Sequence, residues 1–267
     1  MKNTLFKALF TLFAGFIFSY GFSQNIDHQQ GELRIMSYNI HHANPPSQKD
    51  TIDLDAIVEV IRSKNPDLVA LQEIDADTKR SGPGNQAEHI GKALNMHVFF
   101  GKSIDFEGGA YGLAILSKYP LKNTKIHRLP SQKDTEGEPR ILATAAVSLP
   151  DGTLINFGST HLDAQRDDVN RILQIPEIEN IYKENSLPAV IAGDFNAVYT
   201  SEIIKILDRQ FTRTCQHCPP TIPVKNPQKA IDFIAFKGQS YFTIKTHEVL
   251  ENTFASDHLP VFAILQY

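Results

Sequence analysis

The chain has 267 residues, of which 42% are hydrophobic and 21% charged, and its formal net charge is −4. This length and composition allow one large domain or two small ones, and they exclude a collagen, a coiled coil and a disordered chain. The mildly acidic charge also argues against tight binding of duplex DNA, because proteins that bind in this way usually carry a basic face.

Residues 1–23 have the pattern of a signal peptide. Lys2 and Lys7 give a positive start, an apolar run follows, and the small residues Gly21 and Ser23 occupy positions that a signal peptidase prefers. The alternative is an uncleaved membrane anchor, which is disfavoured because the apolar run is short for a span. We therefore expect an exported protein, periplasmic or secreted, cleaved after Ser23.

Cleavage would remove Lys2 and Lys7, leaving 24 Lys and Arg against 30 Asp and Glu, a net charge of −6. A short N-terminal segment, 24–31, would then precede a single folded domain, 32–267. No other stretch is long and apolar enough to cross a membrane, so we expect no span after signal removal.

The first predicted elements are a strand, a helix and a second strand. Residues 32–39 alternate and then run apolar, which is typical of a strand. Apolar residues at helical spacing within 51–67, with Asp53 as N-cap, predict a helix. Residues 67–75 are typical of a buried strand, which we expect to end near Glu73.

The remaining pattern mixes strands with helices. A helix is predicted over 85–95, a second over 167–185 that bends or restarts at Pro176, and a third over 201–211. Strands are predicted over 97–104, 111–121, 140–149, 154–163, 187–193, 230–236, 241–250 and 259–267. Several strands form adjacent hairpins, so we expect an α/β fold with two packed sheets and helices outside.

The sequence has two cysteines, Cys215 and Cys218. A local disulfide is the simplest interpretation in an exported protein. A zinc site is a weaker alternative, because two thiolates and His217 do not fill a tetrahedral structural site. A redox role is weaker still, since the motif lies in a Pro-rich loop and not at the start of a helix.

Polar residues gather at the predicted strand ends. Strands that begin and end at the same sheet edge can bring these side chains to one rim, and massed carboxylates are tolerated there when a cation lies among them. Oxygen ligands without cysteine indicate a hard ion; Mg²⁺ is expected, with Mn²⁺ and Ca²⁺ as alternatives. The residues are Asn39, Glu73, His161, Asp163, Asp194, Asn196, Asp232, Asp257 and His258.

With these residues in view, the chain resembles the endonuclease/exonuclease/phosphatase superfamily, which includes DNase I, exonuclease III-type repair enzymes, bacterial sphingomyelinases and inositol polyphosphate 5-phosphatases. The resemblance runs from Glu32 to Tyr267 and rests on seven motifs in the family order: SYNIHH, LVALQEID, YGLAILSKYPL, STHLD, GDFNA, IDFIAF and SDHLPV. It implies an exported bacterial member with a four-layer α/β sandwich, in which two mixed, mainly antiparallel sheets pack face to face between helices.

The resemblance also implies roles for individual residues. Glu73 corresponds to the principal metal ligand, assisted by Asn39 and, through a second site or water, by Asp257. Asp194 corresponds to the residue that orients or deprotonates the attacking water, and Asn196 to a donor to the phosphate.

Further residues match positions that contact the phosphoryl group. His258, steadied by Asp257 or Asp232, corresponds to one imidazole; His161 corresponds to a second, which the repair nucleases lack. Tyr111 and Arg140 match further phosphate-side contacts, although Arg140 could instead form a surface ion pair with Glu136 or Glu138. Arg166 is a last candidate, with a surface charge at a helix start as its alternative.

The function expected from these residues is metal-dependent hydrolysis of a phosphodiester or phosphomonoester by in-line attack of an activated water. A small or lipid-head-group ester is the first choice, because the chain has no Trp, few basic clusters and modest loops. An exported nuclease of the DNase I type and an inactive phosphate-ligand-binding protein are the alternatives. We expect a monomer without a stable protein or nucleic-acid partner.

Overall fold

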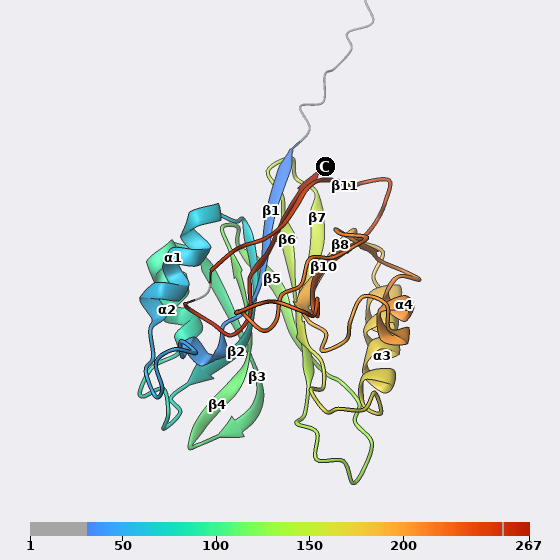
Figure 1. The fold of residues 1–267 in the computed structure, drawn as a ribbon. Helices are drawn as coiled ribbons and strands as arrows, with labels where there is room; N and C mark the ends of the chain where they lie inside the picture. The colour runs from blue at the N-terminus through green and yellow to red at the C-terminus, as the bar shows by residue number, and fades with distance from the viewer. Residues whose placement is uncertain (1–30, 253) are drawn as a thin grey trace, which may run out of the picture.

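The computed structural model describes residues 31–252 and 254–267. The predicted signal peptide, 1–23, and all but the last residue of the predicted segment 24–31 lie outside this range. Within it, two six-stranded sheets face each other, and helices cover the outer face of each (Figure 1). The predicted four-layer α/β sandwich is therefore confirmed. No helix in these two ranges has the length and apolar character needed to cross a bilayer.

The first sheet has the order β11-β12-β1-β2-β4-β3. Only β1 and β2 run parallel in it; the other neighbours are antiparallel. Its strands are β1 (Glu32–Asn39), β2 (Leu68–Ala76), β3 (His97–Phe106), β4 (Gly109–Ser117), β11 (Thr243–Val249) and β12 (Val261–Gln266).

The second sheet has the order β5-β6-β7-β8-β10-β9, and only β7 and β8 are parallel. Both sheets are thus mixed and mainly antiparallel, as expected. The strands are β5 (Leu121–Arg128), β6 (Ile141–Ser148), β7 (Leu154–His161), β8 (Ala189–Asp194), β9 (Thr212–Arg213) and β10 (Asp232–Lys237).

Helices begin at short polar side chains that satisfy free backbone N–H groups. The side chain of Asp53 caps α1 (Leu54–Lys64), Asn85 caps α2 (Gln86–Leu94), and Ser201 caps α4 (Glu202–Leu207). The remaining α-helix, α3 (Arg171–Lys183), runs through Pro176 without a break, so the predicted restart there is wrong. Helices α1 and α2 cover the first sheet, and α3 and α4 cover the second (Figure 1).

Three layers of buried apolar side chains lie between the two sheets and the two helical layers, and they hold the sandwich together. The central layer lies between the sheets and includes Leu33, Ala143 and Phe157. The outer two lie beneath the helices: Ile57 belongs to the layer under α1 and α2, and Ile178 to the layer under α3 and α4. Burial of apolar area on both faces of each sheet stabilises the sandwich and fixes how its rims align.

Several features differ from the expected strands, and one of them is the two-residue strand β9, which was not predicted. β5 was not predicted, because most of its side chains are exposed and its sequence LKNTKIHR lacks an apolar alternation. β2 does not end near Glu73; it continues to Ala76, and its register shifts between Gln72 and Ile74. Glu73 therefore occupies a β-bulge, with a positive φ of 61°.

The predicted disulfide is present. Cys215 and Cys218 are joined in the segment between β9 and β10. The zinc and redox alternatives for these two residues are not supported, since the pair forms a local crosslink.

Candidate active site

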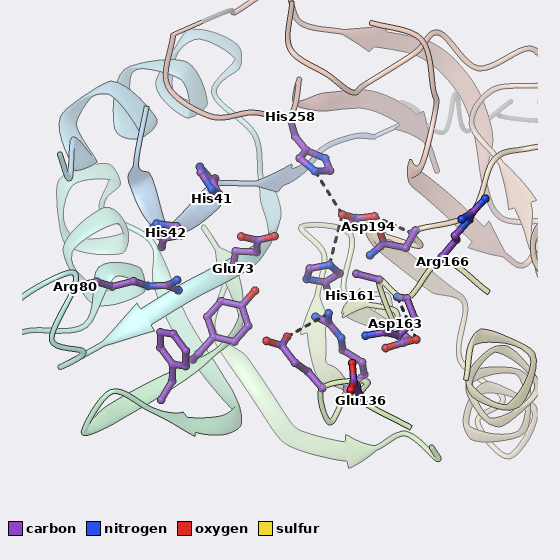
Figure 2. Close-up of a pocket in the computed structure, with 17 residues that line it drawn as sticks. His41, His42, Glu73, Arg80, Glu136, His161, Asp163, Arg166, Asp194 and His258 are labelled. Carbon is purple, nitrogen blue, oxygen red and sulfur yellow. Dashed lines mark hydrogen bonds and ion pairs between the residues drawn. The ribbon is translucent and has the colours of Figure 1, made fainter. Parts of the chain in front are cut away.

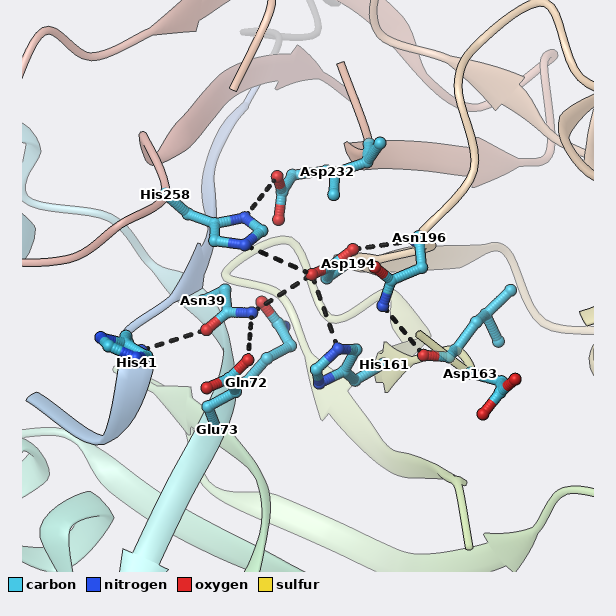
Figure 3. A network of polar contacts seen from close by, with 12 residues as sticks. Asn39, His41, Gln72, Glu73, His161, Asp163, Asp194, Asn196, Asp232 and His258 are labelled. Carbon is cyan, nitrogen blue, oxygen red and sulfur yellow. Dashed lines mark hydrogen bonds and ion pairs between the residues drawn. The ribbon is translucent and has the colours of Figure 1, made fainter. Parts of the chain in front are cut away.

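The strand register brings the predicted strand-end residues to one rim of the sandwich. In the second sheet, Asp194, the last residue of β8, pairs with Asp232, the first residue of antiparallel β10. Asp194 also lies beside His161, the last residue of parallel β7. In the first sheet, Asn39 ends β1 at the same rim, and its side chain reaches across to Asp194 (Figure 3).

The Asp194 carboxylate is the centre of this buried network (Figure 3). Its Oδ2 atom lies 3.5 Å from Nε2 of His161 and 3.7 Å from Nε2 of His258. The same atom accepts a 3.2 Å hydrogen bond from the Asn39 amide. Its Oδ1 atom accepts a 2.8 Å hydrogen bond from the backbone N–H of Asn196. A group near these atoms would meet one carboxylate and two imidazoles together.

His258 is held by Asp232 and not by its sequence neighbour Asp257. Its Nδ1 atom lies 2.9 Å from Oδ2 of Asp232, which also accepts a 2.5 Å hydrogen bond from Thr221. This contact places the Nδ1 proton toward Asp232 and turns Nε2 toward Asp194. Of the two supports proposed for His258, the structure therefore shows Asp232.

The bulge in β2 aims Glu73 at the network. Oε1 of Glu73 accepts a 3.0 Å hydrogen bond from the Asn39 amide nitrogen, which also donates to Asp194. The single Asn39 amide thus links a carboxylate of the first sheet to one of the second. Asp257 is half-buried and makes no direct hydrogen bond to either Asn39 or Glu73, all three being among the described residues.

Burial and crowding raise the carboxyl pKa values. Burial, reinforced by the charge of Asp232, raises the pKa of Asp194 to about 7. Burial also raises the pKa of Glu73, and the charge of Asp257 adds to the effect, although the Asn39 hydrogen bond opposes it. Both groups would favour a nearby cation, because the cation would stabilise their ionised forms.

The two imidazoles are shifted in opposite directions. Burial alone would lower the pKa of His258, but the Asp232 carboxylate, with smaller contributions from Asp194 and Asp257, raises it to about 10. Burial lowers the pKa of His161 well below its ordinary value, and the charges of Arg140 and His258 act in the same direction. Near neutral pH the site therefore offers one protonated and one neutral ring.

A cavity of about 560 Å³ opens over this network (Figure 2). One wall carries His41, His42, Arg80 and Tyr111. The guanidinium of Arg80 makes hydrogen bonds of 2.7 and 2.9 Å to Asp75 and lies 4.5 Å from the Phe106 ring centre. The opposite wall is formed by Glu136, Glu138, Arg140, Asp163 and Arg166.

The remaining predicted residues lie at or beside this cavity. Tyr111 lines it directly. Arg140 is only 6% exposed, and one of its nitrogens lies 3.3 Å from Glu138, so the pair exists but the arginine is not on the surface. Asp163 is buried and does not hold His161, which contacts Asp194 instead.

Asn196 and Arg166 also line the cavity. The Asn196 amide nitrogen donates a 3.0 Å hydrogen bond to the Leu162 carbonyl, which leaves its second N–H available to a ligand. Arg166 is exposed on the loop before α3 and lines the cavity from there.

Two groups of side chains have the chemistry of a metal site. His41, His42 and Glu73 offer ligand atoms within 4.8 Å of one another, and so do Asp194, Asp232 and His258. The carboxylates of half-buried Glu73 and buried Asp194, both with raised pKa values, also fit a divalent cation. The donor set therefore accommodates such an ion at the rim shared by the two sheets.

Comparison with known proteins identifies the family. The family model described as "Endonuclease/Exonuclease/phosphatase family" matches residues 36–258. The chain belongs to the endonuclease/exonuclease/phosphatase family. Members of this family are hydrolases of phosphate esters and generally use divalent metals.

Individual relatives in this family are distant. The uncharacterized protein YbhP of Escherichia coli is 23% identical over 249 residues, covering 88% of this chain and 96% of YbhP. Protein cwh43 of Schizosaccharomyces pombe is 30% identical over 137 residues, 51% of this chain, but the match spans only 14% of cwh43. A mannosyl-6-phosphatase of Bacteroides thetaiotaomicron superposes with a TM-score of 0.72 at 19% identity, covering 88% of this chain and all of that one.

Sequence reasoning missed several residues of the cavity. His41 and His42 lie in the SYNIHH motif, directly after a strand end, and this position could have marked them. Arg80 lies in the loop after β2, and Phe106 ends β3 two residues beyond the predicted strand, so nothing in the local sequence indicated that they meet. The family's motifs thus locate the floor of the cavity better than its walls.

Proposed function

We propose that this protein is a divalent-metal-dependent phosphoesterase that hydrolyses a small phosphodiester or phosphomonoester, and that it acts outside the cytoplasm. The observation that carries the proposal is the convergence of Asp194, His161, His258, Asn39 and Glu73 on one rim beneath an open cavity. Carboxylate, neutral imidazole and protonated imidazole together supply a base and hydrogen-bond donors for attack at phosphorus.

Asp194 is the group that accepts a proton from the attacking water. Its pKa of about 7 lies near the operating pH, where a general base is most effective. The hydrogen bond from the Asn196 backbone fixes Oδ1 and leaves Oδ2 facing the two imidazoles. We therefore assign the attacking water to the Oδ2 side of the carboxylate.

The donors to the phosphoryl oxygens come from both sheets. His258, kept protonated by Asp232, donates from Nε2, and His161 donates or accepts as a neutral ring. The buried Arg140 contributes positive charge next to His161. Removing one such donor typically lowers kcat by about 10²–10³-fold.

Glu73 and Asn39 would hold the divalent ion, with Asp257 contributing charge from a greater distance. When bound, the ion polarises a phosphoryl oxygen and neutralises developing negative charge. In this assignment the residues of the chain position the ester, orient the water and accept its proton.

The cavity walls support a small, polar ester in preference to a nucleic acid. Arg80, Arg140 and Arg166 are interspersed with Glu136 and Asp163, so the walls carry both signs of charge. A groove for a polyanionic strand would instead be lined by cations. Carboxylates and arginines in alternation can bind the hydroxyl groups and the phosphate of a head group or sugar ester.

The proposal is tested with a substrate panel. Purified protein is assayed with p-nitrophenyl mono- and diesters, sugar and inositol phosphates, head-group diesters, and single- and double-stranded DNA, each with and without a chelator. We expect chelator-sensitive hydrolysis of a small ester with little salt dependence. Activity on DNA that falls steeply with salt would favour the nuclease, and no hydrolysis with any divalent metal would favour a binding protein.

A further inference from the structure

The two histidines after β1 lie in an unusual backbone turn. His41, His42 and Ala43 form the short 3₁₀ turn η1 and have positive φ values of 47°, 42° and 59°. Consecutive non-glycine residues rarely adopt this left-handed conformation, because Cβ approaches the following carbonyl oxygen. Such strain persists only where the surrounding structure fixes it, and it concentrates at functional sites.

The turn is fixed from three sides. The Gln86 side chain donates a 2.8 Å hydrogen bond to the His42 carbonyl oxygen, and the backbone N–H of Asp53 donates one of 2.8 Å to the Ala43 carbonyl oxygen. The N–H of Ala43 returns to the Ile40 carbonyl oxygen at 2.8 Å. These contacts hold both imidazole rings at the cavity wall, on the side where Glu73 lies (Figure 2).

The three side chains are close enough to share one ion. One ligand atom from each of His41, His42 and Glu73 lies within 4.8 Å of the others. Two atoms that each lie about 2.0–2.2 Å from a metal lie within roughly 4.4 Å of each other. The three side chains would therefore need to move only slightly to share one ion.

The second contacts of the rings favour metal binding. Nδ1 of His41 lies 3.0 Å from the Asn44 carbonyl oxygen, an acceptor that places the ring proton on Nδ1 and leaves the Nε2 lone pair free. Metal-binding histidines almost always make such a contact. Nδ1 of His42 is buried and has no hydrogen-bond partner among the described residues, which is uncommon for a polar atom unless a ligand satisfies the ring.

We propose that His41, His42 and Glu73 form a two-histidine, one-carboxylate site for a divalent transition metal, with Mn²⁺ and Zn²⁺ preferred over Mg²⁺. The inference rests on the proposed function, which places a divalent ion at Glu73, and it adds two nitrogen ligands to that ion. Imidazole suits transition metals, whereas Mg²⁺ prefers oxygen ligands. With Asn39 the ion has four protein ligands, so a six-coordinate Mn²⁺ would keep two positions open for water and the phosphate ester.

The other candidate cluster is less suited to be this ion's site. Nδ1 of His258 already bonds Asp232, and Nε2 faces Asp194. These groups are partnered with one another as a hydrogen-bonded catalytic unit. Within residues 31–252 and 254–267, His41 and His42 have no such carboxylate partner, apart from Glu73 in the same group.

Calorimetric titration of the metal-free full chain with Mg²⁺, Mn²⁺ and Zn²⁺ tests the proposal. Asn tolerates left-handed backbone, so His41→Asn and His42→Asn should keep the turn while removing an imidazole. We expect each variant to lose at least about tenfold in affinity for Mn²⁺ and Zn²⁺ with little change for Mg²⁺. The matched control is His97→Asn, at an exposed position away from the cavity, which should bind all three ions as the wild type does.

Pulsed electron paramagnetic resonance of the Mn²⁺-loaded protein gives an independent readout. We expect nitrogen couplings from two imidazoles in the wild type and from one in each variant. Absence of nitrogen coupling, or equal weakening of all three ions, would overturn the inference and leave the turn a structural feature. Hydrolysis of the ester panel is measured in parallel: activity without nitrogen coupling rejects this inference alone, and coupling without activity rejects the proposed function alone.

Discussion

The protonation state of His258 depends on Asp232. The ring is buried, and burial favours its neutral form, yet the adjacent carboxylate raises its pKa to about 10. Asp194, by contrast, has a raised pKa because it is buried beside Asp232. Asp232 therefore keeps one neighbour protonated, as a charged hydrogen-bond donor, and makes the other a stronger base, without lining the cavity itself.

This dependence predicts the effect of Asp232→Asn. Loss of the carboxylate should lower the pKa of His258 from about 10 toward its ordinary value, because the largest contribution that raises it is removed. The alkaline limb of the pH profile of kcat/KM should then move to lower pH, with a loss of at least about tenfold at pH 9. The measurement is the profile on a p-nitrophenyl diester for both proteins. An alkaline limb at the same pH in both would contradict the assigned role of Asp232.

At the scale of elements, the loop from Glu136 to Arg140 forms part of the cavity wall opposite His41 and His42. It approaches the segment between β7 and α3 closely: a Cβ at Gly137 would lie 2.5 Å from the Asn170 side chain and 2.6 Å from that of Asp163. Asn170 also accepts a 2.8 Å hydrogen bond from the backbone N–H of Gln132. Arg140 is thus positioned by the contact of this loop with the residues that precede α3.

Gly137→Ala should displace this loop. The added methyl group would lie too close to the ends of the buried Asn170 and Asp163 side chains, so we expect the wall to move away from them and take Arg140 with it. We expect kcat/KM to fall by about tenfold or more, since small misplacements of positioning groups are costly, while the melting temperature changes little. Lys133→Ala, an exposed change in the same loop, is the control and should keep wild-type activity. Equal activity of Gly137→Ala and the wild type would show that the loop does not position the arginine.

The elements that sequence patterns predicted are those with a regular apolar period. Asn39 and Asp194 follow buried strands, and their meeting follows from the register of the sheets. β5 escaped prediction because it is an exposed edge strand rich in polar residues, a common device against edge-to-edge association. The bulge at Glu73 was also missed, because a one-residue insertion leaves no mark on an otherwise apolar run.

Contacts between side chains from distant parts of the chain could not be predicted from their spacing in the sequence. Asp163 lies only two residues from His161, but it lies beyond the end of β7 and makes no contact with the ring. The partner that His161 contacts, Asp194, lies 33 positions later and becomes its neighbour only when β7 and β8 pair. Arg80, in the loop after β2, and Phe106, at the end of β3, likewise meet only once the chain is folded.

At the scale of the whole molecule, the site depends on how the two sheets are held together. The central apolar layer supplies most of the contact, and the side chains of Gln72 and Ser159 join β2 to β7 at 3.3 Å. At another edge, Nδ1 of His247 in β11 lies 2.8 Å from Oγ1 of Thr214, which follows β9. Because Thr214 donates its proton to the Ile234 carbonyl oxygen, His247 is the donor in this inter-sheet bond.

His247 makes stability depend on pH. Burial lowers its pKa to about 4, below the ordinary value of 6.5 in the unfolded chain. Between these values the unfolded chain binds the extra proton, so the free energy of unfolding should fall as the pH drops from 6.5 to 4. His247→Asn retains an N–H donor but does not titrate, and should show a shallower fall. The measurement is urea unfolding across this range, and parallel curves for the two proteins would refute the role of His247.

The central claim is that groups from both sheets act on a single phosphoryl centre, and a double-mutant cycle tests it most directly. Glu73 belongs to the first sheet and Asp194 to the second. The measurement is kcat/KM for bis-p-nitrophenyl phosphate in the wild type, Glu73→Gln, Asp194→Asn and the double variant. We predict that each single change costs at least about 10²-fold and that the double change costs much less than the product of the two. Wild-type activity in either single variant, or fully multiplicative losses, would contradict the account.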